Sequence, residues 1–201
     1  MKLCIIDTKS ANLNSVVQAL KRLDVEPIIT SETDILNKAD KLILPGVGTA
    51  SAVMSGINDG FLYDFILNTK KPLLGICLGM QVLGAASAEV PLNSDLEEIK
   101  TLNIVSGKVR QLHGNDIILP HMGWNTVSHS DHPLFKGIKQ DAYFYFVHSF
   151  AMDVGDYTIG TCEYGVKFTA ALCRDNFMGV QFHPEKSGSV GAMLLNNFIK
   201  L

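Results

Sequence analysis

Charged side chains are scarce in this 201-residue chain, where Asp, Glu, Lys and Arg make up 18% of the positions, against roughly 25% in an average soluble protein. Lys and Arg number 17 and Asp and Glu 20, so the net charge is −3 and no basic excess would attract nucleic acid or an anionic membrane. Only 7 prolines and 47% hydrophobic residues exclude a disordered or collagen-like chain. We therefore expect either an unusually buried chain or an apolar surface kept for a partner.

The cysteines also lack a pattern, since Cys4, Cys77, Cys162 and Cys173 show neither a CxxC pair nor zinc-ligand spacing. They are typical of reduced thiols in a cytoplasmic protein. The HSDH segment at residues 129–132 is expected to be a polar loop rather than a metal site. We predict no metal and no cofactor.

Long hydrophobic runs are missing as well. The apolar residues 3–6 stop at Asp7, which is too early for a signal peptide. Residues 72–88 carry no charge, but this stretch is too short and too rich in glycine to span a membrane. A buried strand that turns into a buried helix explains it better, and no membrane segment is expected.

Strand and helix patterns alternate in the first half of the chain. Strands are predicted at residues 3–6, 25–29, 41–44 and 73–76, and helices at 13–23 (with Asn12 as N-cap), 52–57 and 61–67. Later strand candidates are closer together: 104–112, 117–119, 126–128, 143–147, 158–162, 168–173 and 178–182, before a last helix at 190–199. We predict one α/β domain over residues 1–201, with a mostly parallel central sheet flanked by helices and an antiparallel extension.

The strongest chemical signal is the segment GICLG at residues 75–79. It has the Gly-x-nucleophile-x-Gly form of a strand-to-helix elbow, with the sulfur of Cys77 in place of a serine oxygen. Glycine is needed at both ends because a Cβ atom there would clash in so tight a turn. The helix N-terminus that follows favours a thiolate. A plain glycine-rich turn with a buried cysteine is the alternative.

A cysteine nucleophile needs a base, and the base needs a group that orients it. Of six histidines, only His183 lies beside a carboxylate at a predicted strand end, in the segment GVQFHPE. In extended chain the side chains of His183 and Glu185 project to the same side, so that Glu185 can hold one imidazole nitrogen while the other faces sulfur. Strand ends of a parallel sheet share one edge, which lets Cys77 and His183 converge. A histidine in a simple salt bridge is the alternative.

A third segment, PGVG at residues 45–48, also follows a predicted strand. Glycine lets backbone N–H groups point into a cleft, which suits an oxyanion hole shared with the N–H of Leu78. An ordinary β–α turn is the alternative.

These segments together resemble the class I (triad) glutamine amidotransferases. GICLGMQ, HPE and PGVG carry the resemblance to the class. PHMGWN (120–125), YFYFVHS (143–149) and GVQFHPEKSG (179–188) narrow it to the glutaminase subunits of imidazole glycerol phosphate synthases, over nearly the whole chain. The resemblance implies a flavodoxin-like fold and hydrolysis of glutamine to glutamate and ammonia.

The resemblance also implies a role for each matching residue. Cys77 attacks the glutamine amide, His183 protonates the departing ammonia and Glu185 orients His183. The backbone around Gly46, Val47 and Leu78 holds the oxyanion. The substrate pocket is formed by a second group of residues: Gln81, Glu89, His148, Ser149 and Phe150. Without the resemblance, Gln81 and Glu89 would be assigned to a helix surface.

The PHMGWN segment is expected to be a loop, and a core-packing turn is one explanation for it. Aromatic residues and methionine are also enriched in interface cores. In the family this segment faces a (β/α)8-barrel cyclase subunit, to which ammonia passes for the synthesis of imidazole glycerol phosphate and an aminoimidazole carboxamide ribotide. The implied interface comprises His121, Met122, Trp124, Asn125 and Tyr143.

Departures from the family pattern are few. Residues 8–11 are Thr-Lys-Ser-Ala where many relatives have Tyr-Gly-x-Gly, and Phe150 replaces a commoner tyrosine. They affect glutamine affinity and the interface rather than Cys77, His183 or Glu185. Three alternatives stay open: a stand-alone cysteine hydrolase on the same elbow, a non-catalytic binding module, and a relative that supplies ammonia for sugar modification.

Overall fold

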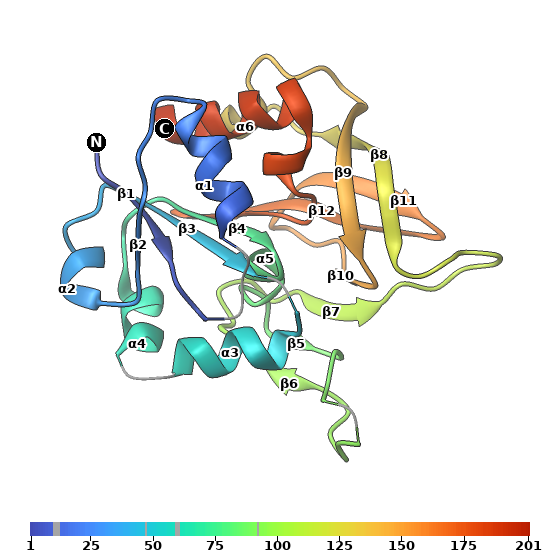
Figure 1. Cartoon of the computed structure of the whole chain (residues 1–201). Helices are drawn as coiled ribbons and strands as arrows, with labels where there is room; N and C mark the ends of the chain where they lie inside the picture. The colour runs from blue at the N-terminus through green and yellow to red at the C-terminus, as the bar shows by residue number, and fades with distance from the viewer. Residues whose placement is uncertain (10–12, 47, 59–60, 92) are drawn as a thin grey trace.

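Apolar strands alternate with helices in the first part of the chain, as its sequence pattern predicts (Figure 1). The computed structural model describes residues 1–9, 13–46, 48–58, 61–91 and 93–201. Five parallel strands lie in the order β2-β1-β3-β4-β13. Their bounds are β1 Leu3–Ile6, β2 Ile28–Thr30, β3 Lys41–Gly46, β4 Leu73–Cys77 and β13 Phe177–Val180.

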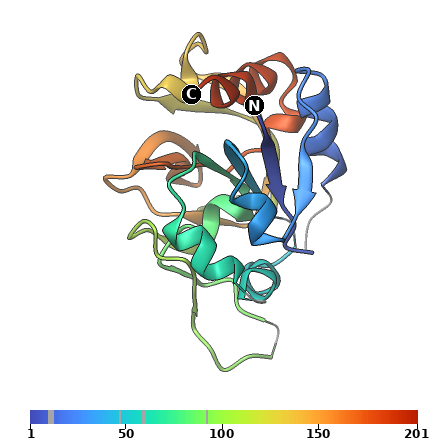
Figure 2. The same ribbon diagram turned by 90° about the vertical axis from the view of Figure 1, so that its left-hand side faces the viewer.

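Helices cover both faces of these strands, and the two views agree that α1 and α6 lie on one side and α3 and α4 on the other (Figures 1 and 2). Their bounds are α1 Asn14–Lys21, α2 Thr33–Leu36, α3 Ala50–Asn58, α4 Leu62–Asn68 and α6 Gly188–Lys200. None of these helices, nor any other in the described part of the chain, is long and apolar enough to cross a membrane. The expected N-cap Asn12 lies outside the described residues.

Two apolar cores result from the alternation of side chains along each strand. In β1, Leu3 and Ile5 pack into the core beneath α1 and α6, whereas Cys4 and Ile6 pack into the core beneath α3 and α4. Burial of each such aliphatic side chain stabilises the fold by about 1.5–3 kcal/mol. Because both of their faces are covered, β1, β4 and β13 are continuously apolar in sequence.

The antiparallel extension begins where β12 (Val166–Arg174) pairs with β13. One branch continues through β10 (Phe150–Met152), β7 (Lys108–Gln111), β5 (Ala86–Ser87) and β6 (Ile99–Lys100). The other runs through β11 (Thr158–Tyr164) and β8 (His121–His129) to β9 (Ala142–His148). The predicted fold class, an α/β domain with a mostly parallel central sheet flanked by helices and an antiparallel extension, is confirmed.

Several predicted boundaries are wrong. Residues 117–119 form no strand, because Asp116 has a positive φ of 60° and Ile118 is 77% exposed instead of pairing. The strand expected from residue 104 begins only at Lys108. The helix expected within residues 72–88 is a single turn, α5 (Leu78–Gln81), and PHMGWN is part of a strand rather than a loop.

Candidate active site

Cys77 lies at the turn between β4 and the single turn of α5. Its backbone angles, φ 54° and ψ −113°, are strained for a residue with a side chain and lift the sulfur above the end of the sheet. A Cβ atom on Gly75 would lie 2.6 Å from the carbonyl oxygen of Gly79, and one on Gly79 would collide with the carbonyl oxygen of Leu44. The steric reason for both glycines is therefore confirmed.

His183 lies between Cys77 and Glu185. Its Nδ1 donates to Oε1 of Glu185 at 2.8 Å, and both side chains are about 5% exposed or less. Cys77 lies on the other side of the ring as a partner whose interaction raises the pKa of His183. Burial alone would lower the pKa of His183, but the hydrogen bonds with Cys77 and Glu185 outweigh it and raise the pKa to about 10. The imidazolium form is thus favoured between the two partners.

The route by which Glu185 reaches His183 differs from the prediction. Strand β13 ends at Val180, and Pro184 begins a 3₁₀-helix, Pro184–Lys186, so the chain is not extended through the HPE segment. Proline fits there because its fixed φ suits the first residue of a helical turn. His183 is fixed instead by its main chain, which donates to Tyr145 O at 2.9 Å and accepts from Ser187 Oγ at 2.7 Å.

The expected oxyanion segment lies directly beside the elbow. Gly46 is the last residue of β3 and pairs with Cys77 across the parallel strands. A Cβ atom on Gly46 would lie 2.7 Å from that of Leu78, so glycine permits this approach. Leu78 is the first residue of α5. The backbone N–H groups in the first turn of a helix have no carbonyl acceptor within that helix. Val47, the other residue predicted for the oxyanion hole, lies outside the described residues.

Cys77 and His183 open into a cavity of about 370 Å³. The lining also includes all five predicted pocket residues: Gln81, Glu89, His148, Ser149 and Phe150. Gln81 is buried and donates from Nε2 to Phe150 O at 2.8 Å, while its Oε1 has no hydrogen-bond partner among the described residues. Glu89 accepts from the N–H of Ala50 at 2.8 Å, and burial raises its pKa. Neither residue lies on a helix surface.

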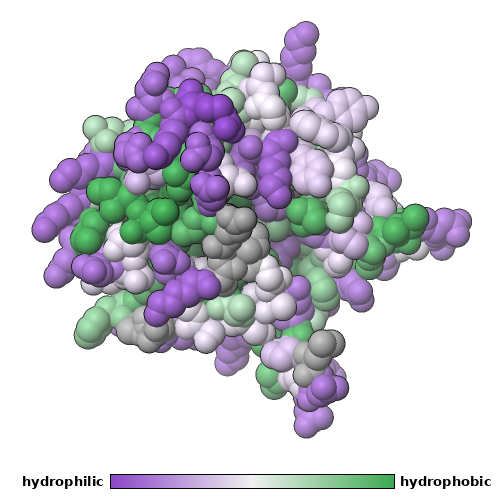
Figure 3. Space-filling view, in the orientation of Figure 1, coloured by the Kyte–Doolittle hydropathy of each residue, from purple (hydrophilic) through white to green (hydrophobic). Residues whose placement is uncertain are grey.

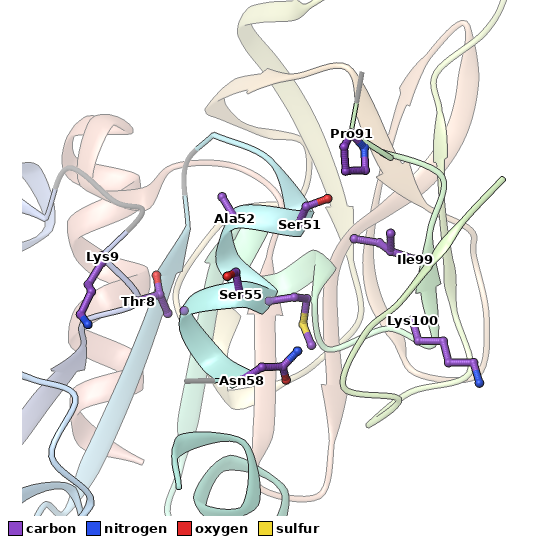
Figure 4. A pocket seen from close by; sticks show the side chains of 11 residues that line it. Thr8, Lys9, Ser51, Ala52, Ser55, Asn58, Pro91, Ile99 and Lys100 are labelled. Atoms are coloured by element: carbon purple, nitrogen blue, oxygen red, sulfur yellow. The ribbon is translucent and has the colours of Figure 1, made fainter. Parts of the chain in front are cut away.

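A larger cavity of about 950 Å³ lies along α3, where Ser51, Ser55 and Asn58 face it (Figure 4). Lys9 lies to one side of the helix and Lys100 to the other. The described lining of this cavity includes no cysteine, histidine or carboxylate. Within the described ranges, no group of three His, Cys, Asp or Glu side chains is placed to hold a metal ion. Of these two cavities, the smaller one brings the nucleophile and the base together.

Comparison with known proteins agrees with this geometry. The model of the family described as glutamine amidotransferase class-I matches residues 4–201. The chain belongs to this family. It is 53% identical to the imidazole glycerol phosphate synthase subunit HisH of Vibrio cholerae serotype O1, over 98% of this chain and 97% of that one. It is 50% identical to HisH 2 of Campylobacter jejuni, over 100% and 98% of the two chains.

Solved structures share the amidotransferase fold at lower sequence identity. PurLQS of Thermotoga maritima has a TM-score of 0.74 at 18% identity, over 99% of this chain and 97% of that one. A glutamine amidotransferase of the same organism has a TM-score of 0.63 at 18% identity, over 100% and 81% of the two chains. These likenesses concern the fold.

Two buried histidines of this amidotransferase, one of which lines the pocket, form one hydrogen-bonded chain. His148 Nδ1 donates to Phe150 O at 2.8 Å, so its Nε2 must accept from His121 Nδ1, 3.0 Å away. His121 Nε2 in turn accepts from Asn125 at 3.3 Å. Burial is the largest cause that lowers the pKa of His148 to about 3 and that of His121 to about 4. Both rings are therefore neutral.

The residues expected at a partner interface separate into two groups. Met122, Trp124 and Tyr143 are 63%, 55% and 59% exposed on β8 and β9. His121 instead is 3% exposed and stacks between Phe146 and Tyr164, so its assignment to a surface is wrong. Asn125 is half-buried and donates to Glu163 O at 3.1 Å.

The segment predicted as a loop forms strand β8 because its backbone pairs with β9. Residues opposite each other in this antiparallel pair include Met122 with Val147 and Trp124 with Tyr145. Opposite residues share a face, so the exposed patch continues along β9 towards Val147, which lines the cavity with Cys77. Glycine at position 123 and the absence of apolar alternation conceal the strand in the sequence.

Three residues at the site were not predicted from the sequence. Gln181 donates from Nε2 to the Cys77 sulfur at 3.6 Å, and the carbonyl oxygen of Val147 lies 3.9 Å from the same sulfur. Lys186 lines the cavity, with its ammonium 5.9 Å from the ring centre of Tyr145. All three lie in segments that carry the family resemblance, Gln181 and Lys186 in GVQFHPEKSG and Val147 in YFYFVHS, but no local pattern marks their side chains as part of the site.

Proposed function

We propose that this chain hydrolyses glutamine to glutamate and ammonia and delivers the ammonia to a (β/α)8-barrel cyclase subunit. That subunit, of the HisF type, would make imidazole glycerol phosphate and an aminoimidazole carboxamide ribotide in histidine biosynthesis. The observation that carries the proposal is the buried Cys77–His183–Glu185 arrangement, whose cysteine and histidine line one cavity. Residues 1–201 act as one domain in this proposal, and four free thiols fit a reducing cytoplasm.

Acylation follows from the protonation state of the pair. His183 takes the proton of the Cys77 thiol, and the sulfur attacks the side-chain amide carbon of glutamine. Negative charge develops on the amide oxygen, beside the N–H of Leu78 and the end of β3 at Gly46. The imidazolium of His183 then protonates the leaving nitrogen, which departs as ammonia and leaves a glutamyl thioester on Cys77.

Deacylation uses the same imidazole as a base. Once the sulfur is a neutral thioester, the charge that helps to raise the pKa of His183 is absent, which favours the neutral ring. Neutral His183 accepts a proton from water as the water attacks the thioester carbonyl. The C–S bond breaks, glutamate leaves and the thiolate returns beside the imidazolium. Glu185 keeps the ring oriented through both steps.

The cavity lining also offers groups that fit the amino-acid end of glutamine. The α-ammonium group needs acceptors, and the buried Oε1 of Gln81 has no partner within the described part of the chain. The carboxylate of Glu89 lies on the same cavity lining. Ser149 supplies a hydroxyl donor to the α-carboxylate. Glutamine therefore enters with its amide at Cys77 and its charged end against Gln81 and Glu89.

The partner surface is proposed at the exposed patch of Met122, Trp124 and Tyr143. Aromatic residues and methionine are enriched at interface cores, and this patch adjoins the cavity through Val147. In Figure 3 the region of β8 and β9 shows many pale side chains of intermediate hydropathy between polar ones. Ammonia released at Cys77 would therefore have a short route to a subunit that covers this face.

The test is a pair of activities measured in complex with a HisF-type cyclase. Cys77→Ala should abolish synthesis that depends on glutamine and retain synthesis from free ammonium, because only the nucleophile is lost. Loss of both activities together would contradict the proposed division of labour. The isolated chain should hydrolyse glutamine slowly, and addition of the cyclase with its nucleotide should accelerate it.

Two results would favour other functions. Strong glutaminase activity of the chain alone, unchanged by the cyclase, would indicate a stand-alone hydrolase. Glutaminase activity that no histidine-pathway cyclase stimulates would indicate a relative that supplies ammonia to another acceptor, such as a sugar.

A further inference from the structure

Gln181 is fully buried between the end of β13 and His183. Its backbone N–H donates to Ala170 O at 2.8 Å, which fixes the residue against β12. Burial of an unpartnered amide is costly, so both ends of the side chain need partners. Gln181 is thus held in a fixed position in the protein interior, next to Cys77.

Each end of the Gln181 amide has a defined partner. Nε2 donates to the Cys77 sulfur at 3.6 Å, and Oε1 accepts from Gln81 Nε2 at 2.9 Å. The second hydrogen of Gln81 goes to Phe150 O. This arrangement fixes the orientation of Gln181, because an amide turned the other way would place two oxygens or two N–H groups against each other. An N–H group is therefore directed at the sulfur.

The neighbours of the sulfur favour different protonation states. The carbonyl oxygen of Val147, 3.9 Å away, accepts a hydrogen bond only from the thiol. The N–H groups of Gln181 and His183 donate best to the thiolate. Gln181 is an uncharged donor that does not take part in proton transfer, so its contribution persists in every protonation state of His183.

We propose that Gln181 is a further catalytic residue, which holds the sulfur of Cys77 and stabilises its thiolate through the N–H···S hydrogen bond. The inference rests on the proposed function. As the S–H bond breaks and the proton moves to His183, negative charge develops on sulfur and the hydrogen bond from Gln181 strengthens. When the C–S bond of the thioester forms, the charge leaves the sulfur and the hydrogen bond weakens.

The test compares Gln181→Met with the wild-type chain by the rate at which iodoacetamide alkylates Cys77 across a pH series. Methionine fills a similar volume and has no N–H. Burial raises the pKa of the Cys4 and Cys173 thiols and raises that of Cys162 to about 12, so these cysteines report background reaction. Peptide mass spectrometry assigns the label to each cysteine. The chain is used alone, because alkylation needs no partner.

Gln81→Met is the matched control. It removes the bond to Gln181 Oε1 but leaves the N–H that faces the sulfur. Gln181→Glu is a second variant, which keeps an oxygen for Gln81 and lacks the N–H. Thermal unfolding and near-ultraviolet circular dichroism establish that each variant is folded.

For Gln181→Met, the pH of half-maximal alkylation should rise by about one unit, as expected when a hydrogen bond to a charged group is lost. Gln181→Glu should show at least the same rise, and Gln81→Met a smaller one. An unchanged midpoint in folded Gln181 variants, with only the melting temperature lowered, would overturn the inference. A raised midpoint in a chain that shows no glutaminase activity even with a HisF-type cyclase and its nucleotide would instead refute the proposed function and leave the role of Gln181 at the sulfur intact.

Discussion

Replacement of His148 by glutamine would remove one imidazole from the buried histidine pair at the pocket and keep the same kind of hydrogen bonds. A glutamine amide offers one acceptor to His121 Nδ1 and one donor to Phe150 O, as the neutral ring of His148 does. The substitution therefore separates the effect of titration from the effect of lost contacts.

The magnitude follows from the pKa of the folded state. The pKa of His148 is lowered to about 3, mainly by burial. The hydrogen bond to Phe150 O raises the pKa, whereas positive charge on His121 or His183 lowers it further. Because the unfolded chain binds the proton near pH 6.5, the free energy of unfolding falls as the pH falls from there towards 3. Between about pH 7 and pH 4.5 the loss from this one group is about 2.5 kcal/mol.

The assay is urea unfolding of wild type and His148→Gln at several pH values in this range. The variant should be less stable than wild type by a fixed amount near pH 7 and should gain about 2.5 kcal/mol relative to it by about pH 4.5. Ser149→Ala, which changes a neighbour without a titratable group, should differ from wild type equally at every pH. Parallel curves for wild type and His148→Gln would refute the neutral, buried state of His148.

Three further predictions concern the elbow, the base and the surface. Gly79→Ala should destabilise the chain by about 3 kcal/mol or more in urea unfolding, because its Cβ collides with Leu44 O; wild-type stability would contradict this. Glu185→Gln should lower glutamine-dependent synthesis about a hundredfold or more and leave ammonium-dependent synthesis intact; equal losses would argue against an orienting role. Trp124→Ala should weaken cyclase binding about tenfold in calorimetry, whereas Phe61→Ala, exposed elsewhere, should not.

The parts of the fold that the sequence predicts well are those with a local cause. Strand β1 occupies residues 3–6, as expected, because every residue in it is buried and apolar. The elbow is recognisable because steric exclusion leaves glycine as the only residue that fits at positions 75 and 79. In both cases the constraint acts within a few residues of the chain.

The parts that were missed depend on contacts between distant residues. Strand β8 is a strand because β9 pairs with it, and nothing in PHMGWN alternates as an isolated strand would. The sequence cannot distinguish Gln181 from a solvent-exposed glutamine, because its partners Cys77 and Gln81 lie 104 and 100 positions away. The resemblance groups His121 with exposed interface residues, although alternation along the strand turns its side chain inward.

The carbonyl oxygen of Phe150 receives two hydrogen bonds, one from His148 and one from Gln81, each 2.8 Å long. The hydrogen bonds of the two histidines and those of Gln81 therefore meet at a main-chain oxygen, which every amino acid possesses. Exchange of the side chain at position 150, including the phenylalanine found here in place of a commoner tyrosine, leaves this junction unchanged. The side chain at this position can therefore be exchanged, for example to alter substrate preference, without disconnecting the histidine pair from Gln81.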